Sequence, residues 1–152
     1  MTVRPDGSKE RLHGHTYNAR VAIDLLEVSF EKFLDLGRVK RALEEVCQEL
    51  NERVLLPGQN RHFVVRRDTD DELEFELCQK RYVLPREDAI VLPLDNVIVE
   101  TLAELVARRF CARLPELVDS ARGVEVEITE VRGQGALCYL ALSGAGASGF
   151  GC

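Results

Sequence analysis

The sequence lacks several features that mark large classes of proteins. No apolar run in its 152 residues approaches the roughly 20 residues of a membrane helix, and no signal-peptide core is expected at its start. Its five cysteines are scattered singly without a CxxC pair, which predicts free thiols and a reducing, cytoplasmic location. It also lacks a basic stripe, and its net charge of -6 argues against nucleic acid or an anionic membrane as the partner.

The remaining sequence has the size of one domain and carries both strand and helix patterns. We expect a single domain over residues 1–143 and a flexible Gly- and Ser-rich tail over residues 144–152. The order of patterns predicts an α+β fold, an antiparallel sheet with two helices packed on one face. The predicted strands are 16–26, 62–67, 72–78, 124–131 and 136–142, and the predicted helices are 36–50 and 98–113, the second capped by Asp95 or Asn96.

Two of the three histidines, His13 and His15, stand one residue apart at the head of the first alternating run. On a strand, side chains at i and i+2 share a face about 6.5 Å apart, so both rings are expected on the core side with Tyr17. Neutral imidazoles placed in this way converge readily on one zinc ion. The alternative is a pair of ordinary hydrogen-bonded histidines, because a zinc site needs a third ligand and the motif supplies two.

A second irregularity is Glu130, near the end of a later strand pattern. Val124, Val126 and Ile128 take the inner face, and the same register puts Glu130 on that apolar face. An unpaired carboxylate there costs several kcal/mol, which favours a ligand with two adjacent N–H donors, such as the edge of a pterin or guanine. The alternative is that the strand ends at Thr129 and Glu130 already belongs to the turn.

Four segments, taken in order, resemble one enzyme family. They are ERLHGHTYNARVAID, DLGRVKRALEEVCQEL, LPLDNVIVETLAELVARRF and VEITEVRGQGALCYL, and together they span roughly Glu10 to Leu142. The sequence in this order is similar to the 6-pyruvoyl-tetrahydropterin synthase family. That family also contains the 6-carboxy-tetrahydropterin synthases of queuosine synthesis and a third type that serves folate synthesis.

The resemblance implies a tunnelling fold, here with an extra hairpin insertion, that self-associates as a trimer or hexamer. It implies a zinc-dependent carbon–oxygen lyase acting on 7,8-dihydroneopterin triphosphate. His13 and His15 match two of the three zinc ligands of the family, and Glu130 matches the glutamate that anchors the pterin ring. Glu100 matches a further glutamate at the start of the second helix, and we expect it to contact substrate.

The sequence also departs from the family pattern. The family has its first zinc histidine and its catalytic cysteine upstream of the histidine pair, and neither residue type precedes His13 here. Glu10 resembles the folate-route type, in which a glutamate replaces the cysteine as proton shuttle; the alternative is a solvated charge. The Asp-His pair that normally follows the first helix is Asn51-Glu52, and Glu52 could still move a proton. His62 is the other histidine, in a predicted hairpin.

Three hypotheses stay open on this basis. The first is an active zinc lyase, for which the family label favours a 6-pyruvoyl product and Glu10 favours 6-hydroxymethyl-7,8-dihydropterin. The second is a catalytically inactive homologue that binds a pterin or serves as a scaffold. The third is an active relative whose N-terminal strand is missing from this chain.

Overall fold

A computed structural model of the protein describes residues 1–29, 34–131 and 133–142, so the predicted tail lies outside the described residues. The chain divides into two compact units. One unit comprises Met1–Gly14 and Leu50–Thr101, and the other comprises His15–Glu49 and Leu102–Cys152. The single domain expected over residues 1–143 stays a prediction.

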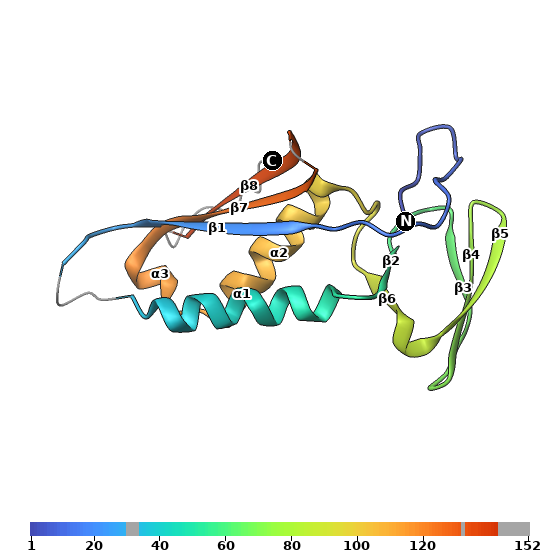
Figure 1. The fold of residues 1–152 in the computed structure, drawn as a ribbon, viewed down its shortest axis with the longest axis horizontal. Coiled ribbons are helices and arrows are strands. Elements are labelled where there is room, and N and C mark those ends of the chain that lie inside the picture. Colours follow the sequence, from blue (N-terminus) through green and yellow to red (C-terminus); the bar gives the residue numbers. More distant parts are fainter. Residues whose placement is uncertain (30–33, 132, 143–152) are drawn as a thin grey trace. The chain divides into compact units, whose positions relative to one another are not determined.

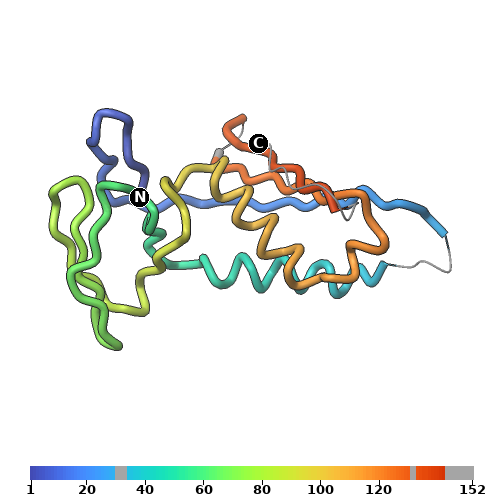
Figure 2. Tube along the Cα trace, turned by 180° about the vertical axis from the view of Figure 1, so that it is seen from behind, coloured from blue at the N-terminus to red at the C-terminus, as the bar shows by residue number. Residues whose placement is uncertain are grey.

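The second unit contains a three-stranded antiparallel sheet with strand order β1-β7-β8. Its helices α1 and α2 lie on one face of this sheet, as the two opposite views agree (Figures 1 and 2). This arrangement confirms the predicted α+β class, and α1 has the bounds expected from its apolar stripe. The elements are β1 (Asn18–Leu25), α1 (Leu36–Leu50), α2 (Val99–Arg113, from Leu102 onward), α3 (Leu117–Ser120), β7 (Ala121–Val131) and β8 (Gln134–Ala141).

The core of this unit follows from the two periodicities of its sequence. From Val124 to Ile128 along β7 every second residue is buried, with Val124 and Val126 fully inaccessible and Ile128 at 3 % exposure. Along α2 the side chains at helical spacing are buried in the same way, among them Leu102 and Phe110. Burying each such side chain stabilises the fold by about 1.5–3 kcal/mol, so β7 and α2 hold the sheet and helix layers together.

The first unit carries the predicted hairpin and two further pairings. Strands β3 and β4 form the expected antiparallel hairpin, and β5 extends it into a three-stranded sheet. Strands β2 and β6 form a parallel pair, which the sequence patterns did not predict. The elements are β2 (Val54–Pro57), β3 (Phe63–Asp68), β4 (Glu72–Leu77), β5 (Lys80–Pro85), η1 (Arg86–Asp88) and β6 (Ala89–Leu92).

The cap predicted for the second helix is wrong. The helix begins at Val99, and the side-chain oxygen of Asn96 accepts hydrogen bonds from the backbone N–H groups of Val3 and Val97, outside the helix. The hydroxyl of Thr101 instead accepts the N–H of Ile98 at 3.3 Å and donates to the carbonyl of Asn96 at 2.8 Å. The side chain of Thr101, in the first turn of α2, therefore stabilises the turn before the helix, and the side chain of Asn96 binds the backbone of the N-terminal segment at Val3.

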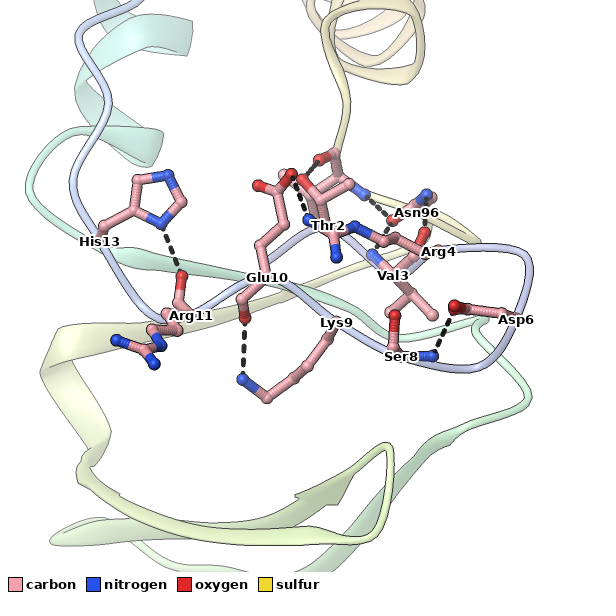
Figure 3. Close-up of polar contacts among 11 residues, drawn as sticks. Thr2, Val3, Arg4, Asp6, Ser8, Lys9, Glu10, Arg11, His13 and Asn96 are labelled. Atoms are coloured by element: carbon pink, nitrogen blue, oxygen red, sulfur yellow. Dashed lines mark hydrogen bonds and ion pairs between the residues drawn. The ribbon is translucent and has the colours of Figure 1, made fainter.

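Residues 1–9 form a small hairpin that leads the chain into the histidine motif (Figure 3). Val3 pairs with Lys9, and Gly7 takes the left-handed conformation, with φ of 79°, that the tight turn requires. Asn96 donates to the carbonyl of Val3 at 2.9 Å while accepting its N–H at 2.8 Å, so both backbone groups of Val3 are satisfied by one side chain.

Among the described residues, no helix is long and apolar enough to cross a membrane.

Candidate metal centre

The histidine motif lies outside the strand on which it was predicted. β1 begins at Asn18, and both His13 and His15 are exposed instead of facing the core. The reason is the partner strand. The register of Asn18 opposite Thr129, continued backwards, would set His13 opposite Gln134, which already begins β8. β7 therefore offers no partner at His13, and the backbone from Glu10 to His15 follows an irregular path.

This irregular path brings together the ligand atoms of Glu10, His13 and His15, within one continuous stretch of six residues. A carboxylate oxygen and one nitrogen from each ring all lie within 4.8 Å of one another. Two imidazoles and one carboxylate are a donor set that zinc accepts, and three protein ligands leave a fourth position for substrate or water. The residues present therefore fit a catalytic zinc ion without a third histidine.

The ring of His13 is oriented by its own backbone. Its Nδ1 donates a hydrogen bond to the carbonyl oxygen of Arg11 at 2.5 Å, and Figure 3 shows the ring turned toward that carbonyl. A carbonyl oxygen can only accept, so Nδ1 carries the proton and the lone pair of the neutral ring is at Nε2. That nitrogen is the ligand atom that the tautomer presents to a metal ion.

The ring of His15 is held from two sides within the second unit. Its Nδ1 contacts a carboxylate oxygen of Glu130, and its face stacks on Tyr17 with ring centroids 5.6 Å apart and an angle of 18°. The carboxylate requires the proton at Nδ1, which again places the lone pair at Nε2. His13 and His15 thus present the same nitrogen, although one is oriented by a backbone carbonyl and the other by a distant side chain.

Glu130 lies in β7, so the alternative that it belongs to the turn is wrong. The pairing of β7 with β8 shifts register between Thr129 and Val131, and Glu130 is the residue at this irregularity. Its side chain is 31 % exposed, so its carboxylate is only partly withdrawn from water. The free-energy cost expected for burying a carboxylate is reduced by this exposure to water and by the contact with His15.

The carboxylate of Glu10 is held in the first unit beside the N-terminal hairpin (Figure 3). The backbone N–H of Glu10 donates to the carbonyl of Thr2 at 3.1 Å, and the ammonium of Lys9 donates to the carbonyl of Glu10 at 2.9 Å. The guanidinium of Arg4 lies 3.8 Å from the carboxylate. These contacts fix the backbone of Glu10 and place its carboxylate beside the guanidinium of Arg4.

Two further predicted site residues lie outside this group of ligands. Glu52 is exposed in the turn after α1 and has a left-handed backbone, with φ of 55°. Glu100 is the second residue of α2 and is also exposed. Among the described residues, the metal-capable group does not include them or His62, whose Nε2 accepts a hydrogen bond from Arg61 at 3.1 Å. Their catalytic and substrate-binding roles stay predictions.

Three of the described cysteines are unsuited to act as the missing catalytic thiol. Cys47, Cys78 and Cys111 are free thiols, and they are half-buried, as is Cys138. Burial raises the pKa of the Cys47, Cys78 and Cys111 thiols, so these groups stay protonated near neutral pH. A proton acceptor for this chain is better sought among carboxylates.

The sequence is similar to one family of known enzymes. The sequence model of 6-pyruvoyl tetrahydropterin synthase matches residues 1–139. A protein of Methanocaldococcus jannaschii, provisionally named 6-carboxy-5,6,7,8-tetrahydropterin synthase, is 35 % identical over 130 residues, which are 84 % of this chain and 78 % of that protein.

Solved structures share the fold at lower identity. The 6-pyruvoyl tetrahydropterin synthase of Plasmodium vivax is 21 % identical with a TM-score of 0.80, and that of Plasmodium falciparum is 19 % identical with a TM-score of 0.82. Each comparison covers 92 % of this chain and 88 % of the other. One of the P. vivax structures carries an alanine in place of a glutamate described as a catalytic residue.

Proposed function

This chain belongs to the 6-pyruvoyl tetrahydropterin synthase family, and we propose that it is a zinc-dependent carbon–oxygen lyase acting on 7,8-dihydroneopterin triphosphate. The observation that carries the proposal is the convergence of Glu10, His13 and His15. The family supplies the substrate class, and this convergence supplies a place for the metal despite the absence of a third family histidine.

His13 and His15 hold the metal through Nε2, the nitrogen that the hydrogen bonds of both Nδ1 atoms select. A bound zinc ion supplies Lewis-acid chemistry, which makes protons next to its oxygen ligands more acidic. The protein residues do the rest: they hold the substrate side chain beside the ion and take up the proton that leaves.

Glu10 is the proposed proton acceptor: one oxygen of its carboxylate can complete the donor set with the two histidines while the other takes up the proton. One oxygen of its carboxylate lies within 4.8 Å of the ring nitrogens of the metal site, and the guanidinium of Arg4 lies 3.8 Å from the carboxylate. For loss of triphosphate, the electron pair left when Glu10 takes a carbon-bound proton forms a C=C bond as the C–O bond breaks, and triphosphate leaves with the electrons of that bond. For cleavage of the side chain, Glu10 takes a hydroxyl proton, the oxygen forms a C=O bond as the C–C bond breaks, and the carbon that remains on the pterin takes the proton back from Glu10. A carboxylate in this role also agrees with the P. vivax enzyme, in which a glutamate is described as a catalytic residue.

The other predicted residues complete the proposal. The carboxylate of Glu130 anchors the substrate by accepting hydrogen bonds from two adjacent N–H donors of the pterin ring. Glu100 contacts the substrate, and Glu52 relays a proton. The protein works in the cytoplasm as a trimer or hexamer, as the family does, with a pterin as its small-molecule partner and no nucleic acid or membrane partner.

A second candidate product is favoured by the same glutamate. With Glu10 in place of the family cysteine, the chain resembles the folate-route type, which gives 6-hydroxymethyl-7,8-dihydropterin. The name of the M. jannaschii relative points to a third product, 6-carboxy-tetrahydropterin. These three products differ in mass, so a single experiment separates them.

The test is incubation of the zinc-loaded protein with 7,8-dihydroneopterin triphosphate, with products identified by mass. We expect turnover to one of these products and its loss in His13→Ala and His15→Ala, which should also lose zinc. Zinc content equal to the parent in both variants would contradict the metal site. Absence of turnover in a zinc-loaded protein that still binds pterin would favour the inactive pterin-binding homologue.

A further inference from the structure

Glu130 contacts His15, although the family pattern suggests only a role in holding the pterin. The two residues lie far apart in the sequence, and their contact joins the end of β7 to the segment that leads into β1. The register of β1 and β7 explains the contact. Asn18 pairs with Thr129 at the start of β1, so the irregular segment just before β1 runs past the end of β7, where the ring of His15 stacks on Tyr17 and contacts Glu130.

The chemistry of the contact is that of an outer partner of a metal ligand. A histidine that binds a metal through one nitrogen commonly donates its other N–H to a carboxylate, which fixes the tautomer and the ring orientation and makes the ligating nitrogen more basic. His15 meets this description, since its Nδ1 contacts the Glu130 carboxylate and its ring stacks on Tyr17.

Resting on the metal site of the proposed function, we propose that Glu130 is a positioning residue for His15 and thereby sets the zinc affinity of the protein. The carboxylate holds the proton on Nδ1, keeps the lone pair on Nε2 and prevents rotation of the ring. The Nδ1 of His13 donates instead to the carbonyl oxygen of Arg11, so a backbone group orients that ring. Substitution of Glu130 therefore acts on one ligand of the pair.

The experiment measures zinc affinity by competition with a chromophoric chelator, which requires no turnover. Glu130→Ala should lower the affinity about 10- to 100-fold, the range found when such outer partners are removed. Glu130→Gln keeps an oxygen that can accept from Nδ1, so it should recover part of this loss. Glu127→Gln is the matched control, because Glu127 lies on the same strand but pairs with Arg20 at 2.8 Å; its zinc affinity should equal that of the parent.

A second measurement separates positioning from a general effect on folding. Long-range ¹H–¹⁵N spectra of the metal-free protein report the tautomer of each histidine. We expect His15 to carry its proton on Nδ1 in the parent and in Glu127→Gln, and to become a mixture of tautomers in Glu130→Ala. The tautomer of His13 should stay unchanged in all variants, and so should the thermal midpoint of the metal-free protein.

The outcomes distinguish this inference from the proposed function. If His15→Ala loses zinc while Glu130→Ala keeps the affinity and tautomer of the parent, the positioning role is overturned and the metal site stands. If His13→Ala and His15→Ala both keep the affinity of the parent, the proposed metal site itself is overturned.

Discussion

The substitution Glu10→Gln tests the proposed chemistry most directly. The amide keeps the shape of the side chain but cannot accept a proton at neutral pH. A positioned general base contributes about 10²- to 10⁴-fold to the rate, so kcat should fall by that factor, equivalent to about 3–5 kcal/mol of transition-state stabilisation. The fold should be almost unaffected, since the Arg4 contact at 3.8 Å joins side chains that are 57 % and 36 % exposed, and such partly solvated pairs contribute at most about 1 kcal/mol.

The assay is a single-turnover measurement on zinc-saturated protein, with zinc affinity measured in parallel. If Glu10 is only a base, Glu10→Gln keeps the zinc affinity of the parent to within a few fold. If Glu10 is also a metal ligand, as its position within 4.8 Å of both rings allows, zinc affinity falls together with kcat. The control is Glu87→Gln, an exposed carboxylate of η1. A kcat for Glu10→Gln within twofold of the parent would refute the assignment.

Three further perturbations test other parts of the structure. Glu52→Gly should raise the free energy of unfolding by about 1 kcal/mol, because φ of 55° suits glycine, and unchanged turnover would overturn the proton-relay role of Glu52. Phe75→Ala should lower that free energy by about 3–5 kcal/mol in urea titration, because Phe75 is fully buried in the first unit; a loss below 1 kcal/mol would contradict this packing. The hydrogen bond from the Arg66 guanidinium lowers the pKa of the Glu76 carboxyl. The pair therefore stabilises the fold at pH values above the pKa that Glu76 has in the unfolded chain. This stabilisation disappears as the pH falls through the lower pKa that Glu76 has in the folded protein. Arg66→Ala should return that pKa toward its usual range by NMR titration, and an unchanged pKa would contradict the pairing.

The sequence predicted best those elements whose periodicity is sustained. The stripe over α1 and the alternation Val124, Val126 and Ile128 extend through whole elements, and the structure confirms both. The parallel pair of β2 and β6 was missed because VLLP and AIVL are four-residue apolar runs without alternation. Such short runs do not distinguish a strand from a buried loop or part of a helix.

The same reasoning explains the partial success at the site. The alternation of β1 was continued upstream to His13, but a strand needs a partner, and β7 has turned into β8 before that point. Glu10 was recognised only by resemblance, because on a strand a residue three positions before His13 would point to the opposite face. The contact of His15 with Glu130 depends on the register between two distant strands, which the sequence alone does not fix.

The contact of Glu130 with His15 also bears on how this residue could serve the pterin. A carboxylate has two oxygens, and each can accept two hydrogen bonds, so one oxygen can hold His15 while both receive the two N–H donors of a pterin edge. The two roles are therefore compatible, but they share one group. Any change that pterin binding makes at this carboxylate alters the partner of His15, and any change at His15 alters the acceptor offered to the pterin. Because binding free energies are linked reciprocally, zinc and pterin should affect each other's affinity by the same factor through Glu130.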